Sequence, residues 1–150
     1  MDLLAVLPQL LPGAIAWAEA QATHVSAVGF SLSESGLVVA RRVGVRYPEQ
    51  IRIKQVEQLP MPEEPMLKQA AIETGLLGPH MAGLTLGYSI LICRGQDTVR
   101  LLSHECRHVY QYETFGSIAA FLPVYLQQIA EVGYNYAQFE IDARTHEFSA

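Results

Sequence analysis

The segment from residue 101 to residue 108 reads Leu-Leu-Ser-His-Glu-Cys-Arg-His and contains the pattern H-E-x-x-H. Apolar residues recur at helical spacing around it, so we expect a helix from Thr98 to Tyr112. Residues four apart lie on one face of a helix, about 6 Å apart along its axis. The imidazoles of His104 and His108 can therefore bind one zinc ion. Glu105 stands where its carboxylate can take a proton from water on the metal.

A catalytic zinc site normally has three protein ligands and a water molecule, so a third ligand must come from elsewhere in the chain. One metallopeptidase pattern, with a glycine and a third histidine soon after the second, is excluded because Gln111 and Thr114 occupy those two places. The only later histidine is His146. Glu140 fits better, since it stands at the start of a helix expected from near Phe139, and the preceding helix can reverse the chain.

The pattern His104-Glu105-x-x-His108 followed by Glu140-x-x-Ala143 resembles the gluzincin zinc metallopeptidases, and the chain length is similar to that of the smallest members, the minigluzincins. The resemblance covers about half the chain. It implies that His104, His108 and Glu140 bind Zn²⁺, that Glu105 is the general base, and that the small Ala143 lets the glutamate helix approach the first helix closely. A peptide or protein substrate is implied as the partner.

Residues 83–147 carry this resemblance, and the segment 84–92 within them resembles the edge strand of that clan and its neighbour. The resemblance implies that the edge strand binds an extended peptide through its main chain, with Thr85 to Tyr88 contacting the substrate. Many gluzincins carry Asp directly after the alanine, whereas this chain has Arg144 there and an acidic residue at Asp142. The group that supports the histidines is therefore left open.

For several residues the sequence leaves more than one role open. Glu140 has a second interpretation as a carboxylate favoured by the dipole at a helix start, in which case Asp142, Glu147 or no residue is the third ligand. A family tyrosine or histidine usually stabilises the oxyanion, and the candidates are Tyr134, Tyr136 and His146, with Tyr134 favoured. Cys106 is expected as a core thiol rather than in a disulfide with Cys93. Arg107 is expected at the helix surface or paired with Asp142 or Glu113.

Outside this region the sequence predicts helices, then a small sheet of three to four strands, then helices, which is an α+β fold. Residues 1–150 are expected to form one domain, with 1–82 as scaffold and 83–150 as the part that carries the site. In the first half of the chain we expect a turn at Pro12-Gly13, a helix over 14–27, a helix from an N-cap at Ser33 to near Val43, and a strand over 51–56. A Pro-rich connector over 59–65 should lead to a helix over 66–73 that Gly75 ends. In the second half we expect one or two strands over 82–93 bent at Gly87, an N-cap at Asp97, and a helix from Gly116 to Gly133 kinked at Pro123.

Composition excludes several classes of protein. Hydrophobic residues make up 50% of the chain and charged residues 17%, which is below the usual value of about 25% and unlike a disordered protein. The net charge of -5 without basic runs disfavours nucleic-acid binding. The first basic residue is Arg41, and Pro8 and Pro12 interrupt the apolar start, so we expect neither a signal peptide nor a membrane span. Two cysteines and no disulfide framework indicate a cytoplasmic protein.

These observations predict a zinc-dependent metallopeptidase. The alternative is an inactive or latent module of the same fold that serves binding or assembly, with the tail over residues 145–150 or a second protomer covering the site. The low charge favours self-association, so a homo-oligomer is left open. Because few residues remain to build a deep pocket, we expect a shallow, open cleft.

Overall fold

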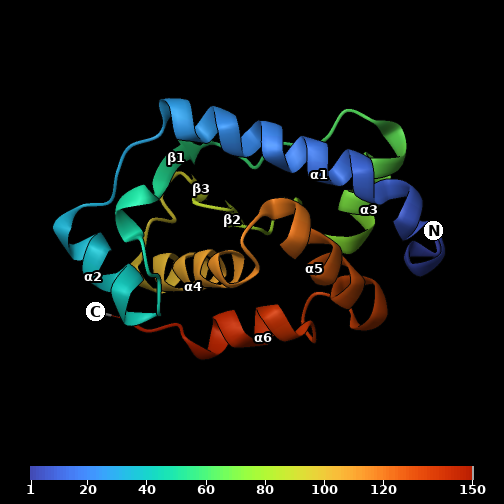
Figure 1. Cartoon of the computed structure of the whole chain (residues 1–150). Coiled ribbons are helices and arrows are strands. Elements are labelled where there is room, and N and C mark those ends of the chain that lie inside the picture. The colour runs from blue at the N-terminus through green and yellow to red at the C-terminus, as the bar shows by residue number, and fades with distance from the viewer. Residues whose placement is uncertain (150) are drawn as a thin grey trace.

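The protein has an α+β fold, as predicted, in a computed structural model that describes residues 1–149 (Figure 1). These residues form six α-helices and one three-stranded sheet. The helices are α1 (Leu3–Val28), α2 (Glu34–Arg42), α3 (Pro65–Thr74), α4 (Val99–Phe115), α5 (Ile118–Val132) and α6 (Gln138–Thr145), with a short 3-10 helix, η1 (Pro48–Gln50). The strands are β1 (Arg52–Val56), β2 (Gly83–Leu86) and β3 (Ser89–Cys93).

The sheet has the strand order β1-β3-β2 and is mixed. Strand β3 pairs in parallel with β1, where Ile53 lies opposite Ile90, and antiparallel with β2, where Thr85 lies opposite Ile90. The reversal between β2 and β3 uses Gly87 at φ 67°, a left-handed conformation that glycine adopts without steric cost. The predicted bend at Gly87 is confirmed, and β2 becomes an edge strand that packs against α4.

Helices cover both faces of the sheet. Successive side chains of a strand point to opposite faces, so Ile90 and Ile92 pack with Cys106 and Val109 of α4, while Leu91 packs toward α1. Figure 1 shows α1 and α4 on opposite sides of the sheet and α6 on the outer side of α4. Because β3 is buried on both faces, the helix that carries H-E-x-x-H has a rigid support behind it.

The first helix is longer than predicted. The turn expected at Pro12-Gly13 is wrong, because α1 begins at Leu3, with Asp2 as its N-cap, and continues through Pro8 and Pro12. Both prolines lie on the exposed side of the helix, where water can solvate the carbonyl groups that proline leaves unbonded. The opposite side buries apolar residues such as Leu7, and this burial favours the helix despite the prolines.

By length and composition, α1 is the one helix within residues 1–149 that could cross a membrane, a test that core helices and signal sequences also pass. Ala18 and Val25 of this helix are buried in the apolar cluster beneath it. The expected cytoplasmic location stays a prediction.

Most helix ends follow the predicted signals. The Ser33 side chain accepts from the backbone N–H of Gly36, and Gly75 ends α3 in the left-handed conformation. The N-cap expected at Asp97 is wrong by one position, because Thr98 caps α4 and accepts from the N–H of Leu101. Helix α5 starts two residues later than predicted, behind an N-cap at Ser117, and continues through Pro123. Helix α6 begins close to its predicted start.

Candidate metal centre

Two helices bring the candidate metal ligands together. His104 and His108 lie on α4 and Glu140 lies on α6, and one ligand atom from each residue falls within 4.8 Å of the other two. Nε2 of His104 is 3.2 Å from Oε1 of Glu140, and Nε2 of His108 is 3.1 Å from Oε2 of Glu140. All three side chains are buried. Among the alternatives left open for the third ligand, the described residues therefore place Glu140 between the histidines.

Packing between α4 and α6 determines this geometry. Ala143 is fully buried at the helix contact, where its small side chain permits close approach. Arg107 of α4 forms a two-point ion pair with Asp142 of α6, with Nε–Oδ2 at 2.8 Å and Nη2–Oδ1 at 3.2 Å. It also donates to the carbonyl of Val43 at 2.8 Å. The pairing of Arg107 with Asp142, one of the predicted alternatives, is confirmed, and it aligns Glu140 two residues earlier.

Each histidine has an acceptor at its other ring nitrogen. A carboxylate only accepts hydrogen bonds, so Nδ1 of His104 donates to Oε2 of Glu147 at 2.7 Å. Nδ1 of His108 donates to Oε1 of Gln111 at 2.8 Å, and the amide nitrogen of Gln111 donates to Oδ2 of Asp142 at 2.9 Å, which orients the amide. Both Nε2 atoms therefore face Glu140, and outer hydrogen bonds of this kind orient metal-binding histidines.

The donor set fits a zinc ion. Zinc is bound by imidazole nitrogen and carboxylate oxygen, and catalytic zinc sites use three protein ligands and keep one open position. Here His104, His108 and Glu140 supply two such nitrogens and one carboxylate at the edge of a cavity. These residues would hold the ion, and the cavity would give water access to it.

The charges of the three side chains stabilise one another. Burial by itself lowers the pKa of His108, but the adjacent Glu140 carboxylate outweighs it and raises that pKa to about 9. The pKa of His104 is raised for the same reason. Burial opposes ionisation of Glu140, yet the charge of His108 and hydrogen bonds from both histidines hold its pKa well below the usual range. The carboxylate thus occupies the position between the imidazoles in its ionised form.

Glu105 lies on the same wall of the cavity and is fixed by β2. The Thr85 hydroxyl donates to Oε1 of Glu105 at 2.8 Å, and the Glu105 side chain is buried. A Cβ built at Gly83 would lie 3.1 Å from Oε2 of Glu105, closer than most real contacts, so glycine leaves the room that the carboxylate occupies. The Thr85 side chain, expected near a substrate, thus contacts the candidate general base. Whether Thr85 to Tyr88 also contact a substrate stays a prediction.

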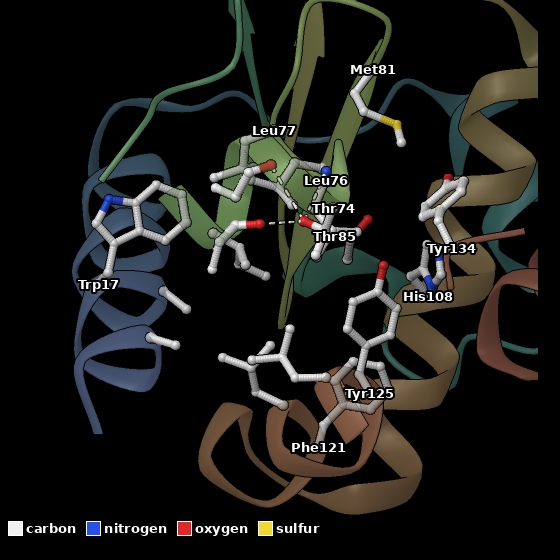
Figure 2. A pocket seen from close by; sticks show the side chains of 18 of the residues that line it. Trp17, Thr74, Leu76, Leu77, Met81, Thr85, His108, Phe121, Tyr125 and Tyr134 are labelled. Carbon is white, nitrogen blue, oxygen red and sulfur yellow. Dashed lines mark hydrogen bonds between the residues drawn. The ribbon is translucent and has the colours of Figure 1, made fainter. Parts of the chain in front are cut away.

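The predicted oxyanion candidates lie in different places. Tyr134 lines the cavity, Tyr136 is 74% exposed, and Nδ1 of His146 donates to the backbone carbonyl of Asp142. Of these three, Tyr134 therefore lies at the cavity, and Figure 2 shows it next to His108. Tyr125 of α5, which sequence reasoning did not assign, donates to Oε2 of Glu140 at 2.8 Å.

Sequence reasoning missed two hydrogen-bond partners of the metal ligands, Gln111 and Tyr125, and gave a third, Glu147, another role. Gln111 stands three residues after His108, a spacing that places both on one helix face and that could have been used. Tyr125 gave no such signal, because its contact with Glu140 crosses between two helices. Glu147 was predicted as an alternative ligand and instead contacts His104 at the ring nitrogen that faces away from Glu140.

A cavity of about 140 Å³ opens from the metal ligands, and its lining is mostly apolar. The opposite side is built by α1 and α3, including Leu7, Trp17 and Ala71. Figure 2 shows Trp17 and His108 on opposite sides of this space. The expected shallow, open cleft differs from this space, which α1 helps to enclose because it reaches farther toward the N-terminus than predicted. Residues 1–82, expected mainly as scaffold, therefore also contribute side chains to the lining.

The tail after α6 lies behind the metal ligands. Glu147 bridges His104 and Arg100, whose Nε donates to Oε1 at 2.8 Å. Phe148 packs with the core cluster on the far side of α4, and Arg42 lies 3.8 Å above its ring. None of the tail residues 146–149 lines the cavity. The described tail therefore supports the site from outside and leaves the cavity uncovered.

Cys93 and Cys106 are both free thiols, so the prediction against a disulfide is confirmed. Cys106 is buried in the core cluster, as expected for a structural thiol.

Comparisons with models of known protein families, with curated proteins and with solved structures found no match to this chain.

Proposed function

We propose that this protein is a zinc-dependent metallopeptidase that hydrolyses peptide bonds. The observation that carries the proposal is the buried group of His104, His108 and Glu140, with both Nε2 atoms facing one carboxylate at the edge of a cavity. A structural zinc site is usually closed by four protein ligands, whereas this group offers three and adjoins a space for water and substrate. Glu105 on the same wall provides a base that the ligand set does not use.

The chain's own residues supply the proton transfers. A zinc ion bound here would act as a Lewis acid, polarising the scissile carbonyl and making water more acidic. Because Thr85 occupies Oε1 of Glu105, Oε2 is the oxygen that takes the proton as the water oxygen bonds to the carbonyl carbon. Glu105 then gives this proton to the amide nitrogen as the C–N bond breaks, releasing a carboxylate and an amine.

In this proposal Tyr134 would donate a hydrogen bond to the carbonyl oxygen. It lines the cavity, and burial together with the Glu140 charge raises its pKa, so the hydroxyl stays protonated at neutral pH. Preorganised donors of this kind stabilise the negative charge that develops on the oxygen during attack.

Metal analysis combined with one substitution tests the proposal. Purified protein is expected to contain about one zinc ion per chain and to cleave a library of quenched fluorescent peptides. Glu105→Gln should keep the zinc and lower the cleavage rate by about 10²–10⁴-fold, because a general base is lost while the ligands stay. Glu131→Gln, an exposed residue of α5, is the matched control and should leave both unchanged.

Absence of zinc binding, or equal cleavage by the wild-type protein and Glu105→Gln, would contradict the proposal. Full zinc occupancy without cleavage of any peptide, at all protein concentrations tested, would favour the alternative of a binding module with this fold. Activity that rises on dilution would instead indicate an active enzyme masked by self-association.

A further inference from the structure

We infer that Tyr125 and Gln128 of α5 form a clamp that holds the first turn of α6 and so positions Glu140 between the two histidines. Both are positioning residues, because they act on α6 and Glu140 rather than on a substrate. The inference rests on the proposed function in one respect, which is that it takes Glu140 as a metal ligand. It assigns a role to α5, a helix that contributes none of the three ligands.

Helix α6 has no side-chain cap of its own. Its N-cap is Ala137, whose side chain makes no capping hydrogen bond. A serine, threonine, aspartate or asparagine at that place would accept from the backbone N–H of the second or third residue of the helix. These residues are Phe139 and Glu140. The turn that carries the candidate ligand therefore lacks local support, in a helix of eight residues that is too short to be stable alone.

Gln128 supplies the missing acceptor from α5. Its side-chain Oε1 accepts from the backbone N–H of Phe139 at 3.0 Å. On the other side of the same residue, the amide of Gln111 on α4 donates to the carbonyl of Phe139 at 2.9 Å. Side chains of two neighbouring helices thus hold the Phe139 main chain, and the first turn of α6 is fixed by tertiary bonds.

Tyr125 holds the side chain that this turn carries. Its hydroxyl donates to Oε2 of Glu140 at 2.8 Å, and Glu140 is 2% exposed. A carboxylate buried to this extent needs such donors, since it has lost its hydration. The Tyr125 ring stacks on Phe121 with centroids 5.7 Å apart and meets the His108 ring edge-on at 6.3 Å. Figure 2 shows Tyr125 next to Phe121 with its hydroxyl pointing into the cavity.

The two bonds leave one face of α5. Tyr125 and Gln128 are three residues apart, so their side chains are neighbours on the helix surface. One bond holds the main chain of Phe139, and the other holds the side chain of the next residue, Glu140. Two bonds to adjacent residues fix both the place of the turn and the direction of the carboxylate. Outer hydrogen bonds to a carboxylate ligand have this orienting effect on metal sites.

Hydrogen exchange of the metal-free protein tests the clamp directly. Gln128→Ala should speed exchange of the backbone amides of residues 138–145, because the Phe139 N–H loses its acceptor and the first turn opens more often. Gln128→Glu keeps an acceptor oxygen at the same place and should restore the protection. Gln127→Ala, at an exposed site on the same helix, is the matched control. Unchanged exchange of α6 in Gln128→Ala would overturn the inference.

Zinc affinity, measured by competition with a fluorescent chelator, tests the effect on the ligand. Tyr125→Phe keeps the ring and should weaken zinc binding by about 10–100-fold, the usual loss for an outer partner of a ligand. Gln128→Ala should weaken it by up to about 5-fold, the value of one helix cap. Tyr88→Phe removes the same kind of bond, to the Glu113 carboxylate at 2.7 Å, and should leave zinc affinity unchanged. Equal affinities for wild type and Tyr125→Phe would contradict the clamp.

A double-mutant cycle separates positioning of Glu140 from a general loss of stability. If Tyr125 acts through Glu140, Tyr125→Phe should cause no further loss of zinc affinity in a Glu140→Ala background. An equally large loss in both backgrounds would show that Tyr125 acts by another route and would overturn the inference.

These measurements distinguish the clamp from the proposed function. Zinc binding and peptide cleavage, with the same zinc affinity in wild type and Tyr125→Phe, would overturn the clamp and keep the proposed function. Zinc binding that Tyr125→Phe and Gln128→Ala weaken, without cleavage of any peptide, would overturn the proposed function and keep the clamp.

Discussion

The cavity has two walls that are built on different principles. The polar wall consists of residues from α4, α6 and β2, and directional bonds such as His108–Gln111 and Thr85–Glu105 fix each side chain. The apolar wall consists of residues from α1, α3 and α5, most of which are held by burial and shape, although Tyr125 of α5 also donates to Glu140. The comparison teaches that the residues proposed for chemistry centre on the short pattern from His104 to His108 and are fixed by directional bonds. The residues of the apolar wall come from distant segments and depend mostly on packing.

The polar wall should dominate metal affinity. Zinc binding to structural sites with four ligands is worth about 10–16 kcal/mol, or about 3–4 kcal/mol per ligand. Glu140→Ala should therefore weaken zinc binding by about 10²–10³-fold, measured by competition with a fluorescent chelator. Glu131→Ala is the control on an exposed site. If Glu140→Ala binds zinc as tightly as the wild-type protein, another residue is the third ligand, and the polar wall described above does not determine zinc affinity.

The apolar wall should dominate stability. Phe121 of α5 is buried, lines the cavity and packs against Phe139 with ring centroids 5.0 Å apart. Phe121→Ala should lower the free energy of unfolding by about 3–5 kcal/mol, as measured by urea denaturation of the metal-free protein. The milder Phe121→Leu should cost less. A large loss of zinc affinity in folded Phe121→Leu would show that packing, in addition to the Tyr125 hydrogen bond, couples the two walls.

A smaller effect on zinc affinity is expected from Glu147, which supports His104 from behind the polar wall. Glu147 accepts from Nδ1 of His104 and does not face the other ligands. Removing such an outer partner typically costs about 10–100-fold in metal affinity. We expect this loss for Glu147→Ala and a smaller one for Glu147→Gln, which keeps an acceptor but no charge. Identical affinities for wild type and Glu147→Ala would make the tail contact irrelevant to the metal centre.

The smallest effect is expected for the side of α4 that packs in the core cluster, where Cys106 makes no bond to a metal ligand and only thiol reactivity is measured. Burial raises the pKa of the Cys106 thiol to about 12, while Cys93 is only half-buried. A thiol reagent at pH 8 should therefore label one cysteine per folded chain and both after unfolding. Cys93→Ser should remove the fast reaction. Rapid labelling of Cys106 in the folded protein would show that the support behind the polar wall opens.

The polar wall was largely predictable from sequence. The helical period places His104 and His108 on one face, and the need for a third ligand points to Glu140 downstream. The apolar wall was not predictable by the same means. Pro8 and Pro12 indicated a break where the structure continues a helix, because burial of residues such as Leu7 outweighs the local cost of proline. A cavity between distant segments depends on packing, which no local pattern encodes.

The position of Glu140 between the two imidazoles has a consequence for the order in which the protein is assembled. Its carboxylate contacts both imidazoles through one oxygen each, so the two helices can pack without a cation. Many small zinc domains, such as zinc fingers, stay unfolded until the metal binds. Here folding would come first and metal loading second. Refolding in the presence of EDTA should give a native circular dichroism spectrum, and failure to refold would show that the ion is needed to build the fold.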